Sequence, residues 1–341
     1  MAPSQSATIL GCLGTCLSAP EAAFFRDANP WGFILFARNI ENPDQLRRLT
    51  GQLHDAVGWN APILIDQEGG RVQRMGRPHW RKWFAPMDQI TKAGPDGAAR
   101  SMYLRSCLIG AELAAVGIDV SCSPMADIAR PQTHPFLKNR TYGDDLAGVI
   151  SAARAVADGL LASGVLPVLK HIPGHGLGSV DSHHDLPTVT ASRSQLLAED
   201  FAAFAALSDL PMAMTAHVVY EAFDDQRPAT LSPILMDLIR SQIGFSGLVM
   251  TDDLSMNALP GTLAARAAGA RAAGVDVILH CNGEPSKMRD VVAAAGVLDA
   301  QAADRANAAL ARRTAPDLLD IAAVEAELEL LLQGSVYDNA E

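Results

Sequence analysis

Short apolar runs recur along the chain, and a segment of helical character follows each of them. The runs are ATILGCL (7–13), WGFILFA (31–37), APILID (61–66), IDVSCSP (118–124), LPVLKH (166–171), PMAMTAH (211–217), GLVMTDD (247–253) and VDVILH (275–280). They are rich in Val, Ile and Leu and show little alternation with polar residues. Continuous apolar runs of this length are typical of strands buried on both faces of a parallel sheet.

The segments between the runs carry Ala, Leu and Arg at helical spacing and end at Gly, as in residues 42–58, 98–117, 232–244 and 262–274. Eight strand–helix alternations within roughly 300 residues predict a closed (β/α)8 barrel. A doubly wound open sheet, which usually has fewer strands, is the alternative. No low-complexity tract or Ser/Gly linker divides the 341 residues. We therefore expect one domain over residues 1–341, with a helical C-terminal segment from about residue 284.

Composition and charge narrow the class of protein. Apolar residues make up 49% of the chain, enough for a large core, and the net charge of −11 without a basic patch argues against nucleic-acid binding. The stretch ATILGCLGTCLSAP resembles a secretion signal, but no Lys or Arg precedes it, so we expect a buried first strand. The sequence has no run of about eighteen consecutive apolar residues, so we expect no membrane span. Five cysteines without a regular spacing favour reduced thiols and a cytoplasmic protein.

Polar side chains gather where the predicted strands end. In a barrel the carboxyl ends of all strands meet at one mouth, where active sites are built. This placement favours an enzyme over a structural or binding protein. The residues at these ends are Asp66, Lys170, His171, His217, Asp252, Asp253 and His280.

The stretch VLKHIPGHGLGSVDSHHDLP (168–187) holds the densest set of reactive side chains. A metal site is one interpretation, but the compact ligand spacings of zinc sites are missing. A phosphate loop is another, but Ser179 stands where G-x-G-x-x-G needs its third Gly. The alternating Gly174, Gly176 and Gly178 instead predict a loop that can move over a pocket. The metal ligands of the first interpretation are His171, His175, His183, His184 and Asp185.

A proton-transfer site is the third interpretation of this stretch. Asp181 and His183 are two positions apart, so in an extended loop their side chains point to the same side. The carboxylate then favours the protonated imidazole, and the pair can act as a general acid and base. Either Asp252 or Asp253 can supply a nucleophile, while the other begins a helix.

Asp66 and Arg74 flank the segment DQEGGRVQR (66–74). A carboxylate and a guanidinium at fixed spacing can hold the neighbouring hydroxyls of a sugar. They can equally form a structural ion pair at the rim of the barrel, and the spacing alone does not separate these two interpretations.

Four motifs together resemble glycoside hydrolase family 3, and more narrowly its bacterial single-domain β-N-acetylglucosaminidases of peptidoglycan recycling. They are ILIDQEGGRVQR (63–74), NRTYG (139–143), LKHIPGHG (169–176) followed by DSH (181–183), and GLVMTDDLSM (247–256). The motifs come in the order of the family and cover roughly Ile9 to Cys281. The His-containing loop is specific to the glucosaminidase branch of the family.

The resemblance implies a role for each matching position. Asp252 matches the nucleophile that forms a covalent glycosyl-enzyme, and His183 matches the acid/base, with Asp181 as its partner. The terminal N-acetylglucosamine would be held by Asp66, Arg74, Arg140, Lys170 and His171. Members of the family are cytoplasmic, need no metal or cofactor, and remove N-acetylglucosamine from N-acetylglucosaminyl-1,6-anhydro-N-acetylmuramic acid with or without its peptide.

Some positions and alternatives remain open at this stage. We expect a monomer, a solvent-facing His184, and structural or supporting roles for Asp119, Asp127, His217 and His280. Related enzymes that transfer the sugar to phosphate share these motifs. A metal-dependent hydrolase built on the His171–His184 cluster is a further alternative, whereas a sugar-binding protein without turnover is disfavoured because nucleophile and acid are both present. An imidazolium acid beside an ionised Asp252 predicts a bell-shaped pH dependence.

Overall fold

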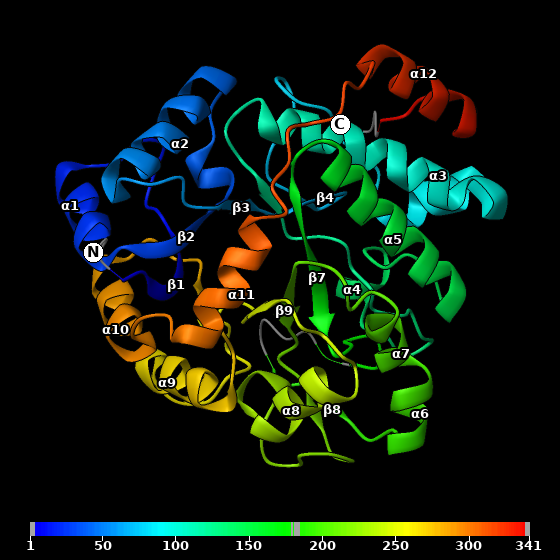
Figure 1. Ribbon diagram of the computed structural model, residues 1–341. Coiled ribbons are helices and arrows are strands. Elements are labelled where there is room, and N and C mark those ends of the chain that lie inside the picture. Colours follow the sequence, from blue (N-terminus) through cyan, green and yellow to red (C-terminus); the bar gives the residue numbers. More distant parts are fainter. Residues whose placement is uncertain (1–3, 179, 181–184, 338–341) are drawn as a thin grey trace.

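Parallel strands form a barrel at the centre of the molecule (Figure 1). The computed structural model describes residues 4–178, 180 and 185–337. Asp181, His183 and His184 therefore lie outside the described residues. In the described part of the chain, eight strands make up the main sheet: β1 (Ser6–Gly11), β2 (Pro30–Leu35), β3 (Ile63–Ile65), β6 (Val120–Ser121), β7 (Leu166–Ile172), β9 (Met212–Thr215), β11 (Leu248–Met250) and β12 (Ile278–His280).

The strand order excludes the doubly wound alternative. The neighbours run β11-β9-β7-β6-β3-β2-β1-β12, so each strand lies beside the next one along the chain, and the order never reverses as it does in a doubly wound sheet. The two ends of this order meet, because Met250 bridges Val277 and the Val277 amide donates to the Val249 carbonyl at 3.2 Å. Each apolar run of the sequence overlaps one of these strands. The predicted (β/α)8 barrel is confirmed.

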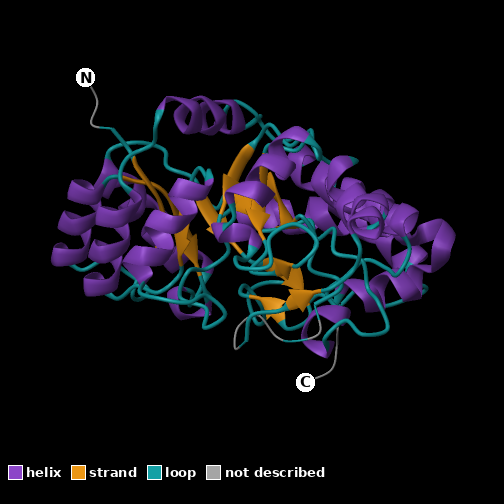
Figure 2. Ribbon diagram, turned by 90° about the horizontal axis from the view of Figure 1, so that it is seen from below, coloured by secondary structure: helices purple, strands orange, loops and turns teal. Residues whose placement is uncertain are grey.

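Helices surround the strands, as the two perpendicular views show (Figures 1 and 2). Helix α2 covers the segment predicted from residues 42–58: the Asn42 side chain accepts from the Gln45 amide at its start, and Gly58 ends it with φ 74°. The α-helices of the described chain are α1 (Ala19–Ala28), α2 (Pro43–Val57), α3 (Pro86–Ala114), α4 (Pro135–Lys138), α5 (Leu146–Ala162), α6 (Arg193–Ala198), α7 (Asp200–Ala205), α8 (Pro233–Ser241), α9 (Leu263–Ala273), α10 (Pro285–Ala295), α11 (Ala300–Leu310) and α12 (Ile321–Leu331).

The barrel is filled with side chains rather than hollow. Ile9, Ile34, Leu64 and Val168 from four strands belong to one buried inner cluster. Ala306 and Ala309 of α11 belong to the same cluster, together with Trp31, Leu166 and Leu248 from the first residues of their strands. Helix α11 therefore covers the amino-terminal end of the barrel, which leaves the carboxyl-terminal end for the site (Figure 1).

Short elements are built on the loops at the carboxyl ends of the strands. The antiparallel pair β4 (Gln67–Gly69) and β5 (Val72–Gln73) follows β3, and the pair β8 (Thr188–Val189) and β10 (Val219–Tyr220) lies beyond β7 and β9. The short 3-10 helices are η1 (Ala37–Asn39) and η2 (Ala229–Leu231). None of the helices in the described chain has the length and apolar character needed to cross a bilayer.

Candidate active site

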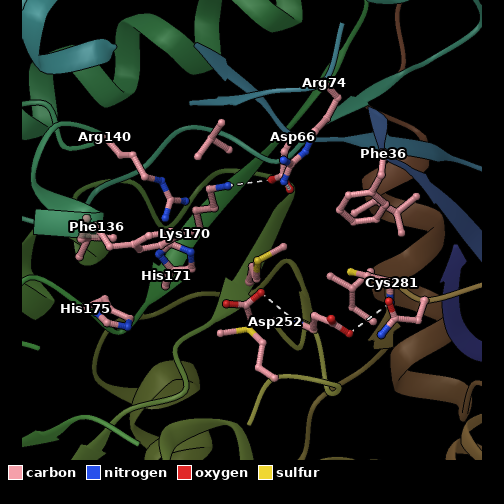
Figure 3. Close-up of a pocket in the computed structure, with 18 of the residues that line it drawn as sticks. Phe36, Asp66, Arg74, Phe136, Arg140, Lys170, His171, His175, Asp252 and Cys281 are labelled. Atoms are coloured by element: carbon pink, nitrogen blue, oxygen red, sulfur yellow. Dashed lines mark hydrogen bonds and ion pairs between the residues drawn. The ribbon is translucent and has the colours of Figure 1, made fainter. Parts of the chain in front are cut away.

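A cavity of about 310 Å³ opens among the carboxyl ends of the strands (Figure 3). One wall carries the charged side chains of Asp66, Arg74, Arg140 and Lys170, and the aromatic rings of Phe36 and Phe136 lie at two sides of the cavity. A polar pocket of this size with aromatic rings at its sides suits a single sugar ring with attached groups. The lining includes Ile34, Phe36, Arg38, Asp66, Arg74, Phe136, Arg140, Lys170, His171, His175, Val180, Met214, Asp252, Asp253, Met256, Leu279, Cys281 and Asn282.

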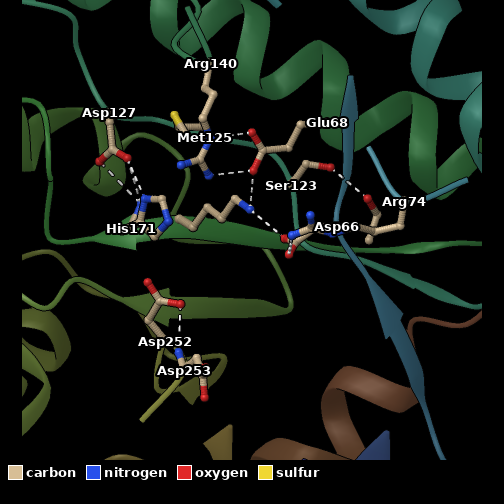
Figure 4. Close-up of polar contacts among 12 residues, drawn as sticks. Asp66, Glu68, Arg74, Ser123, Met125, Asp127, Arg140, His171, Asp252 and Asp253 are labelled. Atoms are coloured by element: carbon tan, nitrogen blue, oxygen red, sulfur yellow. Dashed lines mark hydrogen bonds and ion pairs between the residues drawn. The ribbon is translucent and has the colours of Figure 1, made fainter. Parts of the chain in front are cut away.

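The charged wall is a chain of ion pairs. The Lys170 ammonium, on β7, lies 3.1 Å from Asp66 Oδ1 and 2.5 Å from Glu68 Oε1. Arg74 donates to the other Asp66 oxygen at 3.0 Å. Arg140 donates to both oxygens of Glu68, at 2.8 and 2.9 Å (Figure 4). Asp66 and Arg74 therefore form an ion pair and also line the cavity. The two interpretations left open by the sequence, a structural ion pair and a pair that holds a sugar, are compatible.

These contacts keep the wall ionised. Burial raises the pKa of Asp66, but Lys170 and Arg74 more than reverse this and hold it below its ordinary value. Burial likewise raises the pKa of Glu68, but Arg140 and Lys170 have a larger, opposite effect, so the pKa lies below its ordinary value. For Lys170 burial lowers the pKa, while Glu68 and Asp66 raise it by more. The wall therefore presents fixed charges and fixed hydrogen-bond geometry to a ligand.

His171 is held by a buried carboxylate behind it. Asp127, which is fully buried, accepts from His171 Nδ1 at 2.7 Å (Figure 4). Its other oxygen accepts from the His175 backbone amide at 2.6 Å. Burial raises the pKa of Asp127, but His171 lowers it to below the ordinary value, so the carboxylate stays ionised. The proton of the His171 ring is thereby fixed on Nδ1, and Nε2 is left for other contacts.

The Asp252 carboxylate faces the cavity across from His171 and Lys170 (Figures 3 and 4). Its Oδ1 accepts from the Asp253 amide at 2.8 Å, and Oδ2 has no hydrogen-bond partner among the described residues. Burial raises the pKa of Asp252, whereas His217, His171, the Asp253 amide and Lys170 together lower it below its ordinary value. An ionised carboxylate with one oxygen directed at a cavity has the properties of a nucleophile.

Asp253, the second residue of the pair, is used within the protein. Its carboxylate accepts from the Ser255 hydroxyl, from the Ser255 amide at 3.1 Å and from the Cys281 amide at 3.2 Å. These contacts join the loop after β11 to the end of β12. His217 supports the same loop, because its Nε2 lies 3.1 Å from the Asp253 carbonyl oxygen while Nδ1 contacts the Thr230 hydroxyl at 2.7 Å. Asp253 thus holds the turn that presents Asp252.

The structure brings most of the expected site residues to one cavity. These are Asp66, Arg74, Arg140, Lys170, His171 and Asp252. The expected acid/base pair, Asp181 and His183, lies outside the described residues, although Val180, immediately before it, lines the cavity. Asp119 is remote from the cavity lining, since its carboxylate accepts from the Ile63 amide at 2.8 Å and pairs with Arg313 at 2.5 Å.

Among the residues of the site that the sequence did not indicate are Glu68, Phe36 and Phe136. Glu68 lies inside the DQEGGR segment, and its position two residues after Asp66 was the available signal. Phe36 and Phe136 form apolar surfaces at two sides of the cavity (Figure 3), and each has two guanidinium groups over its ring. Phe36 directly follows β2, so its place at a strand end could have indicated a position at the mouth of the barrel. No feature of the sequence indicated Phe136.

Comparison with known proteins places this geometry in a family. The family model for the glycosyl hydrolase family 3 N-terminal domain matches residues 17–312. A β-hexosaminidase of Bordetella avium is 35% identical over 275 residues, covering 79% of this chain and 78% of that protein. NagZ of Neisseria gonorrhoeae in complex with N-trifluoroacetyl-D-glucosamine is 28% identical with a TM-score of 0.85, covering 96% of this chain and 98% of that one.

A second structure of gonococcal NagZ, in complex with a zinc ion, has a TM-score of 0.82 at 28% identity and covers 97% of both chains. The motifs of the sequence and the shape of the barrel thus lead to the same group of proteins, and the resemblance drawn from the sequence is confirmed. The chain belongs to glycosyl hydrolase family 3 and is a glycoside hydrolase.

Proposed function

We propose that the protein is a retaining β-N-acetylglucosaminidase that hydrolyses terminal, non-reducing β-linked N-acetylglucosamine from muropeptides. The single observation that carries this proposal is the Asp252 carboxylate, ionised and with one oxygen that accepts no hydrogen bond from the described residues, facing a charged wall across a cavity of monosaccharide size. The β-hexosaminidase and NagZ relatives support the choice of an acetamido sugar. The substrate would be N-acetylglucosaminyl-1,6-anhydro-N-acetylmuramic acid with or without its peptide.

The charged wall would orient the terminal sugar. The Asp66 carboxylate accepts hydrogen bonds from hydroxyls, and the Arg74, Arg140 and Lys170 cations donate to them. Their mutual ion pairs fix these groups before the sugar arrives, so little side-chain freedom is lost on binding. His171 offers Nε2 to the same ring, because Asp127 occupies Nδ1. A ring held in this way places its anomeric carbon against Asp252.

The reaction would then proceed in two displacements. Asp252 attacks the anomeric carbon and forms a carbon–oxygen bond, while the glycosidic bond breaks and the leaving oxygen takes a proton from His183. Water next attacks the same carbon and gives a proton to His183, which releases Asp252 and leaves the β configuration unchanged. Asp181 would favour the protonated form of His183 in the first step. Lys170 and the Asp253 amide favour the ionised form of Asp252.

Hydrolysis of p-nitrophenyl N-acetyl-β-glucosaminide beside the corresponding glucoside tests this proposal. We expect wild type, pretreated with EDTA, to act on the acetamido sugar, and Asp252→Ala to lose at least about 10⁴-fold in kcat because a covalent step is removed. A 2-fluoro sugar that traps the glycosyl-enzyme should label Asp252. Asp253→Asn is the comparison variant: it keeps the nucleophile and weakens only the turn that presents it, so it should lose far less activity than Asp252→Ala and should still be labelled on Asp252.

Three outcomes would contradict the proposal in different ways. Labelling of Asp253 would show that Asp252 is not the nucleophile. Loss of wild-type activity on chelation would favour the metal-dependent alternative, a point of interest because one related NagZ was solved with zinc. A rate that requires added inorganic phosphate, with release of the sugar 1-phosphate, would favour phosphorolysis over hydrolysis.

A further inference from the structure

Arg38 differs from the other cations that line the cavity. Arg74 pairs with Asp66, and Arg140 and Lys170 pair with Glu68. Arg38, in contrast, has no ion-pair partner among the described residues. Its Nε donates to the Cys12 carbonyl at 3.0 Å and its Nη2 to the Cys281 carbonyl at 2.5 Å. Both acceptors are neutral, so these contacts orient the guanidinium without neutralising its charge.

The orientation of Arg38 is fixed by three strand ends. Arg38 lies in η1, just after β2, while Cys12 and Cys281 follow β1 and β12. Its guanidinium also lies over the Phe36 ring, 4.9 Å from the ring centroid. A guanidinium has five N–H groups, and these contacts use only two of them. The remaining donors are held in place at the cavity and available to a ligand.

The position of Arg38 indicates which part of a substrate it would meet. Lys170 is 2% exposed, and it marks the inner wall of the cavity, whereas Arg38 is exposed at the rim. In an enzyme that removes a terminal sugar, that sugar fills the enclosed part of the pocket and must reach Asp252. The group attached through the glycosidic oxygen then extends toward the opening. A ligand of Arg38 therefore belongs to the leaving group.

We infer that Arg38 recognises a carboxylate on the leaving group and so sets the preference for anionic substrates. This inference rests on the proposed function, since a muramic acid residue without its peptide carries a free lactyl carboxylate, whereas in the peptide-bearing substrate that group is an amide and the free carboxylates lie on the peptide. A fixed guanidinium binds a carboxylate through two parallel N–H donors. Asp253, an acidic neighbour in the lining, is oriented by the neutral Ser255 and Cys281 amides and keeps its charge, so it opposes the attraction of Arg38 for an anion without removing it. With a net charge of −11, the chain as a whole repels anions, so their recognition needs a local cation.

A pair of substrates that differ only in this charge tests the inference. The first is N-acetylglucosaminyl-1,6-anhydro-N-acetylmuramic acid, and the second is its lactyl methyl ester. We expect wild type to prefer the free acid, and Arg38→Met to lower the ratio of kcat/KM for acid over ester by about tenfold, as for one charge-assisted contact. Arg38→Lys keeps the charge and should retain part of the preference. Arg48→Met, which removes an exposed cation from α2, is the matched control and should leave the ratio unchanged.

The ratio separates recognition from a structural role. Loss of the two carbonyl contacts would lower kcat/KM on both substrates equally and leave the ratio unchanged; that result would overturn the assignment of Arg38. If neither disaccharide is cleaved by wild type, the proposed function fails and the inference fails with it. If Arg38→Met does not fold, the salt dependence of wild type tests the inference instead. The ratio of kcat/KM for acid over ester should fall as sodium chloride rises from roughly 0.05 to 0.5 M, because salt screens the exposed pair of Arg38 and the substrate carboxylate. A salt-independent ratio would overturn the inference.

Discussion

Asp127 connects two segments of the site through one buried side chain. One oxygen accepts from the His171 ring at 2.7 Å and the other from the His175 amide at 2.6 Å. His171 faces the cavity, and His175 lies in the glycine-containing turn after β7. Because both acceptor atoms are used by N–H donors, only an ionised carboxylate satisfies the two contacts together.

We therefore expect Asp127→Asn to lower kcat/KM by about 10- to 100-fold with little loss of secondary structure. An amide has one acceptor oxygen, so its NH₂ group must face either the His171 ring proton or the His175 amide, and a buried donor is left without an acceptor. Steady-state kinetics and the melting temperature, measured on the same samples, check the expectation.

Asp276→Asn is the matched control for this variant. Asp276 is also buried and accepts from Arg240, Arg305 and the Val249 amide, but it lies at the amino-terminal end of the barrel. Asp276→Asn should lower the melting temperature but leave kcat/KM within about twofold of wild type, since the contacts of Asp276 do not reach the site. If activity falls in proportion to stability in both variants, Asp127 has a structural role only.

At the scale of elements, the apolar runs contained enough information to place every strand of the barrel. Helix α2 was also placed well, because Asn42 and Gly58 are strong start and stop signals. The strand-end residues could be assigned to one mouth because parallel strands share a direction. The contact of Glu68 with Lys170 and Arg140 could not be inferred from the sequence, since these residues are 102 and 72 positions away and their approach depends on how the strands are aligned around the barrel.

Gly176 shows why glycine is needed in the turn after β7. A Cβ at this position would lie 2.0 Å from the Ile128 carbonyl oxygen and 2.9 Å from its carbon. Both are backbone atoms of the segment that carries Asp127, and the Gly176 carbonyl accepts from the Thr133 hydroxyl at 2.5 Å. The turn and this segment are thus packed backbone to backbone, and a methyl group would separate them.

Gly176→Ala should accordingly destabilise the protein by about 1–3 kcal/mol and lower kcat/KM, because overpacking displaces the turn that follows His171. Gly51→Ala is the matched control. Gly51 lies inside α2, and a Cβ added there would have no atom of a neighbouring segment within 4 Å. The same substitution should there stabilise the protein by about 0.5–1 kcal/mol through helix propensity. Urea unfolding of both variants measures the difference; equal effects would contradict the packing explanation.

At the scale of the whole molecule, the charged wall of the cavity is also part of what holds the barrel together. Asp66 follows β3, Glu68 lies in β4, Lys170 lies in β7 and Arg140 follows α4. Their ion pairs therefore join segments separated by up to about a hundred residues in the chain. Buried ion pairs add little net stability compared with apolar packing, but removal of one partner leaves a buried charge without compensation. The same cluster should therefore govern both substrate binding and acid stability.

The sign of the pH effect follows from the lowered carboxyl pKa values. Burial raises the pKa of Glu68, but Arg140 and Lys170 bring it from 4.5 down to about 2 in the folded protein. Such a group contributes stability that is complete above its unfolded pKa and is lost as the pH falls through its folded pKa. The wild-type free energy of unfolding should therefore decline between about pH 5 and pH 2, because folded Glu68 and Asp66 resist the protons that the unfolded chain binds.

Glu68→Gln removes one of these carboxylates. It should lower the free energy of unfolding at pH 7 by about 3–5 kcal/mol, because Lys170 and Arg140 lose a buried counter-charge. It should also flatten the decline between about pH 5 and pH 2, because one group fewer takes up a proton on unfolding. Glu327→Gln, which breaks an exposed pair with Arg100, should cost less than about 1 kcal/mol. Urea unfolding at a series of pH values measures both effects. Parallel curves for wild type and Glu68→Gln would show that acid sensitivity arises elsewhere in the molecule and that the wall serves binding alone.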